Sequence, residues 1–193
     1  LTKIFGPLFN GLIDQTVVLG EVGAMWVMDM EDQSVLRYEG PGTFTSMNPW
    51  FTTAGIQPAT TVGGFATPLS WGYRLAARMD FINAIGPVTL QPTFAFSHDV
   101  EGTSPSPTVS FIEGRMAGTV ALTANYLNRY RFKVSYTNYF SVKGKKNEVT
   151  KWTYANNLNN IDVIPRDLIL EADQYNNLLV DRDFISFTFS VSF

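Results

Sequence analysis

The residues from 185 to the end of the chain alternate strictly between two kinds of side chain. One parity is entirely apolar and consists of Ile185, Phe187, Phe189, Val191 and Phe193, whereas the other carries only serine and threonine. Because successive side chains of a β-strand point to opposite faces, this segment predicts a strand with one apolar and one hydroxyl-bearing face. The apolar face of such a strand has to lie against a protein core or against lipid.

The same alternation recurs in five segments upstream. They cover residues 18–28, 71–83, 88–97, 112–126 and 129–141. Within each segment the charged side chains keep to one parity, as Arg74, Arg78 and Asp80 do opposite Trp71 and Tyr73. The segments have roughly the 9–11 residues that a tilted strand needs to cross a bilayer. We therefore expect an all-β chain with about six antiparallel strands.

Two kinds of antiparallel structure are compatible with this pattern. In a soluble barrel or sandwich the apolar parity fills the interior, whereas in a transmembrane barrel it faces lipid and the polar parity faces the lumen. Aromatic residues favour the membrane, because Trp71, Tyr73, Tyr126 and Tyr130 lie near the ends of their segments, where interfacial girdles are found. We predict an antiparallel transmembrane β-barrel, and the soluble sandwich is the alternative.

Short and long connections alternate along the chain. Residues 83–87 and 127–128 predict short turns, and long loops are expected near 29–70, 99–110 and 142–182. Outer-membrane barrels have short periplasmic turns and long outer loops, so this order places the C-terminus on the periplasmic side. About eight strands are the usual minimum for a single-chain membrane barrel. We therefore expect residues 1–193 to form the C-terminal part of one larger barrel, with further strands before Leu1. The alternatives are that several chains each contribute a sheet or that the long loops contain further strands.

The segment from Asp183 to Phe193 resembles the C-terminal signal of bacterial outer-membrane proteins, in which a terminal phenylalanine follows alternating apolar positions. The resemblance implies a location in the outer membrane of a Gram-negative bacterium. It also implies that the barrel-assembly machinery recognises the apolar parity of this last strand.

A second resemblance covers nearly the whole chain. It is carried by residues 36–43 (LRYEGPGT), 54–60 (AGIQPAT), 64–67 (GFAT), 70–74 (SWGYR), 97–100 (SHDV), 177–179 (NLL) and 181–184 (DRDF). These segments resemble the domain-of-unknown-function-1302 family of proteobacterial outer-membrane proteins, whose members are longer. Residues 142–176 depart from the family's pattern, and we expect a specialised outer loop there. The family has no firm activity, but its genes often lie beside resistance-nodulation-division type transporters, which implies traffic of hydrophobic or lipid-like molecules.

Seven charged residues are candidates for lining the lumen. They are Arg74, Arg78, Asp80, Glu113, Arg115, Arg131 and Lys133. The plain interpretation is that Glu113 with Arg115, and Arg74 with Arg78 and Asp80, form ion pairs and hydrogen bonds across a polar interior. The more specific interpretation is that these charges form a constriction that selects solutes. Arg131 and Lys133 extend its charged lining if their strand lies next to the others.

Little in the sequence points to catalysis. His98 is the only histidine, and it shares a parity with Phe94 and Phe96, which favours a structural role at the membrane interface over a catalytic one. Cysteine is absent, so thiolate metal sites are excluded. We expect no enzyme and no cofactor.

Ligand-binding motifs are equally sparse. Asp29, Glu31 and Asp32 form an acidic cluster, for which solvated loop charge is preferred over a calcium site. A net charge of -3 with scattered basic residues gives no patch for nucleic acid. Residues 163–173 predict a short amphipathic helix or 3₁₀ turn.

Three functions remain, in order of preference. The first is a channel or transporter component for a hydrophobic, lipid-like or anionic solute. The second is a structural or surface-assembly barrel whose long outer loops bind partner proteins, and the third is a membrane enzyme. The expected partners are outer-membrane lipid, the barrel-assembly machinery and a transporter or surface protein complex.

Overall fold

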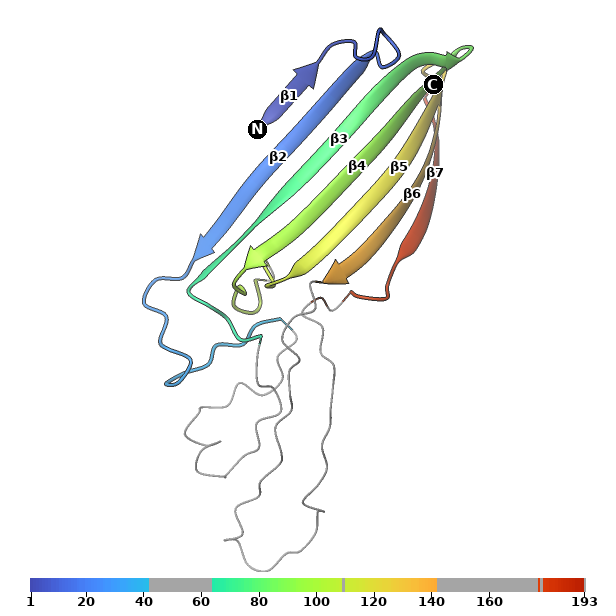
Figure 1. The fold of residues 1–193 in the computed structure, drawn as a ribbon. Coiled ribbons are helices and arrows are strands. Elements are labelled where there is room, and N and C mark those ends of the chain that lie inside the picture. The colour runs from blue at the N-terminus through green and yellow to red at the C-terminus, as the bar shows by residue number, and fades with distance from the viewer. Residues whose placement is uncertain (42–63, 109, 142–176, 178, 193) are drawn as a thin grey trace, which may run out of the picture.

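A computed structural model describes residues 1–41, 64–108, 110–141, 177 and 179–192 (Figure 1). Its strands are β1 (Thr2–Phe5), β2 (Gln15–Trp26), β3 (Leu69–Ile85), β4 (Val88–Glu101), β5 (Arg115–Tyr126), β6 (Tyr130–Ser141) and β7 (Phe184–Val191). Each strand pairs antiparallel with the next, so the seven form one sheet in chain order. In the part of the chain that the structure describes, β1 and β7 do not pair with each other, so the sheet is open. The all-β antiparallel prediction is confirmed, and none of the described residues belongs to a helix long and apolar enough to cross a membrane.

The register joins the apolar parities of neighbouring strands into one continuous face. One row across the sheet from β2 to β7 is Val18, Ala77, Phe94, Val120, Tyr136 and Ile185. The adjacent row, which points to the other face, is Val17, Arg78, Thr93, Ala121, Ser135 and Ser186. Alternation within each strand therefore becomes segregation over the sheet, because the pairing from β2 to β7 keeps one phase except near the ends of the β3–β4 pair, where the register shifts between Trp71 and Gly72 and between Phe81 and Ile85.

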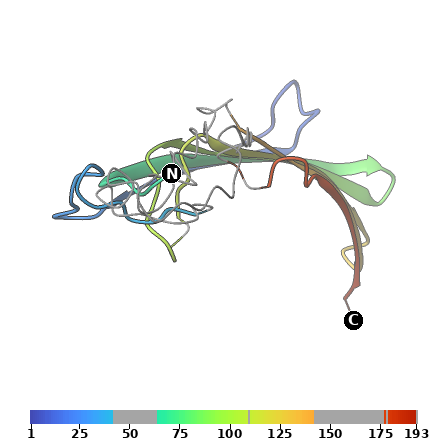
Figure 2. The same ribbon diagram turned by 90° about the horizontal axis from the view of Figure 1, so that it is seen from below.

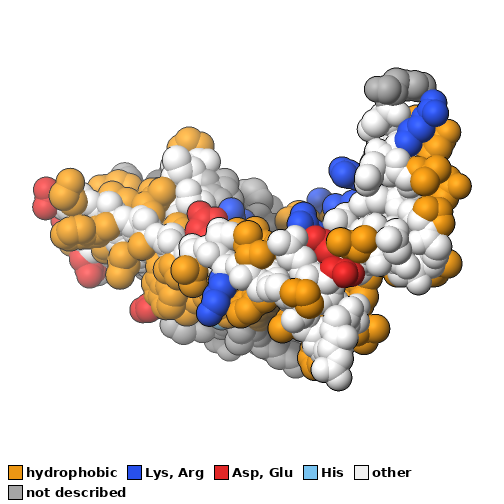
Figure 3. Space-filling view, turned by 90° about the horizontal axis from the view of Figure 1, so that it is seen from above, with side chains coloured by type: hydrophobic (Ala, Val, Ile, Leu, Met, Phe, Trp, Pro, Cys, Tyr) orange, Lys and Arg blue, Asp and Glu red, His pale blue; other side chains and the backbone are white. Residues whose placement is uncertain are grey.

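The sheet is a single, bent layer. Seen from below, the β7 end turns away from the plane of β2 and β3 (Figure 2). On the arm formed by this end, hydrophobic side chains cover the outer side of the bend, and Lys and Arg side chains gather in its hollow (Figure 3). Among the described residues no second layer covers the apolar face, so Val22, Ile185 and Phe187 are 73%, 61% and 70% exposed.

Short and long connections lie at opposite ends of the strands. The turns after β1, β3 and β5 lie at the same end as the C-terminus, and the connections after β2, β4 and β6 leave from the other end (Figure 1). Between β5 and β6, Leu127 and Asn128 have φ angles of 52° and 54°, and the amide of Arg129 donates to the oxygen of Tyr126 at 3.1 Å. Positive φ at both central residues is the type I′ geometry that matches strand twist. The predicted short turns are confirmed.

Strand β1 was not anticipated. It pairs Thr2–Phe5 with the start of β2, so the described residues contain seven strands rather than about six. Its alternation is reversed relative to the rest of the sheet, since Lys3 lies opposite Val18 on the apolar side and Ile4 opposite Val17 on the polar side. Four residues with this pattern give no periodic signal.

Several strand ends also differ from prediction. β3 begins earlier and ends later than expected, and β4 continues to Glu101, so the following connection spans 102–114 rather than 99–110. Residues 112–114 belong to that connection instead of to β5. The helix or 3₁₀ turn predicted at 163–173 lies outside the described residues.

Candidate functional site

Six of the seven predicted charged residues lie on the polar face of the sheet. Arg74, Arg78 and Asp80 come from β3, Arg115 from β5, and Arg131 and Lys133 from β6. The seventh, Glu113, precedes β5 and belongs to the connection. These residues form a group near the short turns and a second group near the long connections, with Arg74 between them. The sheet brings the predicted residues to one face but not into one cluster.

The group near the short turns is a hydrogen-bond chain across four strands. Nε of Arg78 lies 3.1 Å from Oδ1 of Asp80, and the same carboxylate accepts from Nε2 of Gln91 at 2.9 Å. Oε1 of Gln91 accepts from Nδ2 of Asn125 at 2.7 Å, and Oδ1 of Asn125 accepts from Nε of Arg131 at 3.0 Å. The predicted pairing of Arg78 with Asp80 is confirmed, whereas the linking amides of Gln91 and Asn125 were not predicted. Their position on the polar parity was the signal that pointed to them.

Hydroxyl groups occupy the middle of the polar face. Thr119 of β5 and Thr137 of β6 share a hydrogen bond of 3.0 Å between their side chains. Ser135 donates to Ser186 of β7 at 3.4 Å. Lys133 lies next to this region, paired in register with Thr123 and Thr188, and is exposed. The hydroxyl groups of this surface can donate hydrogen bonds to water and polar solutes and accept them, but these residues do not form a nucleophile–base pair.

Near the long connections, the ion pair of Arg115 is with Asp99. Nε of Arg115 lies 2.6 Å from Oδ2 of Asp99, whose side chain is only 9% exposed. The same oxygen accepts from the amide of Ile112 at 3.0 Å. Asp99 belongs to β4 rather than to the predicted loop at 99–110, and it continues the polar parity of its strand. Glu113, the partner expected for Arg115, instead has its amide 3.4 Å from Oγ1 of Thr103.

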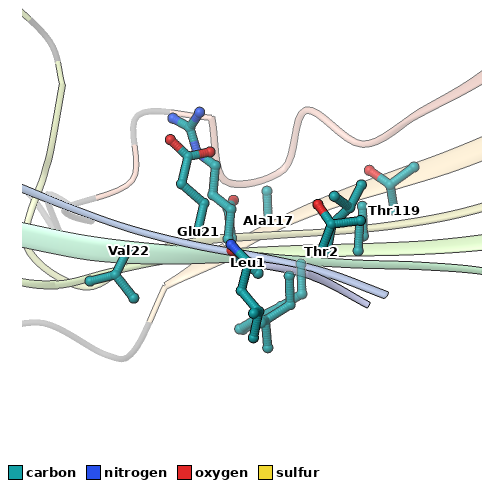
Figure 4. Close-up of a pocket in the computed structure, with 14 residues that line it drawn as sticks. Leu1, Thr2, Glu21, Val22, Ala117 and Thr119 are labelled. Carbon is teal, nitrogen blue, oxygen red and sulfur yellow. The ribbon is translucent and has the colours of Figure 1, made fainter. Parts of the chain in front are cut away.

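Two hollows are found on the polar face, with volumes of about 680 and 580 Å³. Glu21 of β2 and Arg74 of β3 line both, and they face each other directly in the register. In the larger hollow, Thr2, Glu21, Ala117 and Thr119 point to the same side of the sheet, while Val22 points to the other (Figure 4). Charged groups that could bind a solute are therefore available in both hollows, and the larger hollow also contains the hydroxyl groups of Ser97 and Thr119.

His98 lies on the apolar face, as its parity predicted. Nδ1 is 3.4 Å from the hydroxyl of Tyr73, and the two rings meet edge to face with centroids 5.5 Å apart. The ring of Phe96 lies 6.4 Å away on the same face. These contacts make His98 part of an aromatic cluster near the edge from which the long connections leave.

The acidic cluster of Asp29, Glu31 and Asp32 lies after β2, and Asp32 forms a turn with the residues that follow it. Oδ1 of Asp32 accepts from the amide of Ser34 at 2.8 Å, and hydrogen bonds from Ser34 hold the pKa of the Asp32 carboxyl below its usual value. Within the described ranges, no three residues of metal-binding type are grouped so as to hold an ion.

Asn177 was not recognised as a structural residue. Its side chain is 1% exposed and donates through Nδ2 to the oxygens of Met116 and Phe140, at 3.0 and 2.9 Å. These carbonyls lie near the long-connection ends of β5 and β6, so Asn177 fixes the end of the last connection onto the sheet.

Asp183, just before β7, likewise binds the residues at the end of β6 and so fixes the chain onto the sheet. Its carboxylate accepts from the hydroxyl of Tyr136 at 2.7 Å, from Nδ2 of Asn138 at 2.6 Å and from the amide of Tyr139 at 3.2 Å. These bonds, with that from Tyr136 first, hold the pKa of Asp183 below its usual value. Both anchors fall in segments that carried the family resemblance, which indicated the position but not the role.

Comparison with known proteins gives one result. Searches among curated proteins and among solved structures returned no match. The family model described as "Protein of unknown function (DUF1302)" matches residues 2–193. Since this match covers nearly the whole chain, from the first strand to the last alternating segment, the chain belongs to the DUF1302 family.

Proposed function

We propose that this chain forms part of a β-barrel in the bacterial outer membrane and acts as a channel or transporter component, with its polar face lining the lumen. The observation that carries the proposal is the segregation of the two faces by the register from β2 to β7. Phe94, Val120 and Phe187 are 47%, 49% and 70% exposed on the apolar face. Transferring a fully exposed side chain of this kind out of water is worth about 1.5–3 kcal/mol, so such a face requires an apolar surrounding.

Strand length supports a membrane as that surrounding. β2, β5 and β6 each have 12 residues. At a rise of about 3.4 Å per residue such a strand is roughly 40 Å long, and a tilt of about 45° reduces its span to roughly 28 Å. This span matches an outward apolar band of about 25 Å. The aromatic cluster of Tyr73, Phe96 and His98 near one end suits an interfacial girdle.

The edges of the sheet add a requirement. β1 and β7 each have one strand neighbour among the described residues, and open edges are not tolerated in hydrocarbon. In the proposed barrel, further strands therefore pair with β1 and β7. The exposed apolar positions of the last strand, Ile185, Phe187 and Phe189, suit recognition by the barrel-assembly machinery.

The polar face suits a lumen that contains water. Five cationic side chains, Arg74, Arg78, Arg115, Arg131 and Lys133, lie on it together with Glu21, Asp80 and Asp99. Charges that line a pore set its ion preference, and the excess of cations favours solutes with an anionic group. A lipid-like solute, as the resemblance implies, fits this wall only if its charged headgroup meets these residues.

The test is conductance and solute flux of the full-length protein in planar lipid bilayers and proteoliposomes. We expect stepwise ion currents with a preference for anions, and Lys133→Glu, which changes an exposed charge on the polar face, should weaken that preference. The matched control is Lys133→Arg, which keeps the positive charge at the same exposed position and should leave the preference unchanged. Absence of both current and flux from correctly inserted protein would refute the proposal.

A surface-assembly barrel is the second candidate. It is favoured by the connections after β2, β4 and β6, which all leave from the edge opposite the C-terminus (Figure 1). This function predicts that the wild-type protein inserts without carrying current and that a variant lacking residues 143–176 still inserts but loses a bound surface partner. If the wild-type protein conducts and the variant keeps its partner, the channel is favoured instead.

A further inference from the structure

The connection between β4 and β5 folds back over the polar face instead of extending away from the sheet. Phe111 lies in this connection, yet its ring reaches β2, where a Cβ atom added to Gly23 would lie 3.2 Å from Cζ of Phe111. Gly23 has the parity of Glu21 and therefore belongs to the polar face. Since β2 lies two strands from β4 and strands are about 4.8 Å apart, the connection crosses roughly 10 Å of the polar face, over β3.

Phe111 is held in this place by hydrogen bonds on both sides of its backbone. Its amide donates to Oγ of Ser104 at 3.0 Å, and its oxygen accepts from the amide of Ser104 at 2.9 Å. Ser104 is completely buried, and its hydroxyl lies 3.1 Å from that of Ser70 in β3. The tip of the connection is therefore fixed to the sheet through a buried residue.

The base of the connection is fixed by an ion pair. Arg115 binds Asp99 and also donates from Nη2 to the oxygen of Ser110 at 3.0 Å, next to Phe111. The amide of Gly114 donates to the oxygen of Asp99 at 2.8 Å. A charge-assisted bond of this kind is roughly twice as strong as a neutral one, so the folded-back position is well determined.

Between the connection and the sheet lies the smaller hollow, of about 580 Å³. Its lining includes Glu21, Gly23, Arg74 and Phe111. A solute that moves along the polar face past this hollow has the ring of Phe111 on one side. On the other side it has Glu21 of β2 and Arg74 of β3.

We propose that the described residues of the connection between β4 and β5, 102–108 and 110–114, form an internal constriction of the barrel and that Phe111 is its specificity-determining residue, limiting the size of the solutes that pass. This inference rests on the proposed channel function. The glycine at position 23 is part of the arrangement, because any side chain there would meet the ring. The constriction lies near the edge of the long connections, so solutes entering from that side meet it before they reach the hydroxyl-lined middle of the face.

The experiment uses the full-length protein in planar bilayers. Phe111→Ala removes the ring, and we expect the single-channel conductance to rise on the order of 1.5-fold, with passage of larger solutes in liposome-swelling assays. Because the chain has no cysteine of its own, Phe111→Cys can be modified by methanethiosulfonate reagents of increasing size after the protein has folded and inserted. Conductance should then fall step by step with reagent size. Phe94→Ala and Phe94→Cys, on the apolar face, are the matched controls and should leave conductance unchanged.

The outcomes separate the two proposals. Wild-type protein that inserts but carries neither current nor solute overturns the channel function and this inference together. Wild-type current that responds neither to Phe111→Ala nor to modification at position 111 overturns the constriction and leaves the channel standing. Modification after insertion avoids dependence on whether Phe111→Ala folds.

Discussion

Placement of the apolar face in lipid is tested most sharply at Val120. This residue lies near the middle of β5, opposite Phe94 on one side and Tyr136 on the other, and is 49% exposed. Its neighbour Ala121 points to the polar face. Three substitutions follow: Val120→Arg, Val120→Trp and Ala121→Arg.

The three environments predict different energies. In the middle of a bilayer, an outward arginine costs about 2–4 kcal/mol, which is roughly a 30- to 900-fold change in the folding equilibrium. Lipid adapts to a larger apolar side chain, so Val120→Trp should change stability little. In a packed protein core the added volume would instead destabilise the protein by about 1–3 kcal/mol. Water tolerates both substitutions within about 0.5 kcal/mol. Ala121→Arg, on the polar face, should also stay within about 0.5 kcal/mol.

The assay is reversible guanidinium unfolding of the full-length protein in phospholipid vesicles, followed by circular dichroism so that the added tryptophan does not disturb the signal. Lipid contact predicts that Val120→Arg alone shifts the midpoint. A shift of similar size for Val120→Trp would show that another protein layer packs on this face and would refute the membrane placement. No shift in either variant would mean that the face is in water.

Three further predictions concern the anchors of the connections. Arg115→Met should expose the connection after β4 to protease and destabilise the protein by about 1.5–3 kcal/mol, because Asp99 loses its charged partner; unchanged proteolysis would contradict this. The pKa of Asp183 is lowered in the folded state, so its ionised carboxylate stabilises the fold above the unfolded pKa of about 3.9. This stabilisation is lost as pH falls through the lower folded pKa. Unfolding of the wild type, measured as a function of pH, should show the loss, and Asp183→Asn should lack it. Asn177→Ala leaves two carbonyls without their donor and should cost about 1–3 kcal/mol, measured as the shift in unfolding midpoint, with Asn177→Gln as the control for the amide itself.

The sequence alone was sufficient to predict strands β2 to β7, although not their ends, and the face to which the side chains in the correctly predicted parts point. Both follow from a period of two residues, which is a local property of an extended chain. The parity of Arg78, Arg131 and Lys133 placed them on one face before any pairing was known. The parity of His98 likewise placed it among aromatic residues, and Leu127 and Asn128 mark a turn between two alternating segments.

Only the tertiary structure decided which residues meet. Asp99 rather than Glu113 forms the ion pair with Arg115, and Phe111 lies against Gly23, 88 positions away in the chain numbering. Asn177 binds carbonyls of two strands, one of them 61 residues distant. These contacts depend on strand order, register and the path of the connections, and a periodic pattern carries no information about any of the three. The two faces of this sheet are therefore determined by the sequence locally, whereas the residues that narrow and anchor it are determined by the fold.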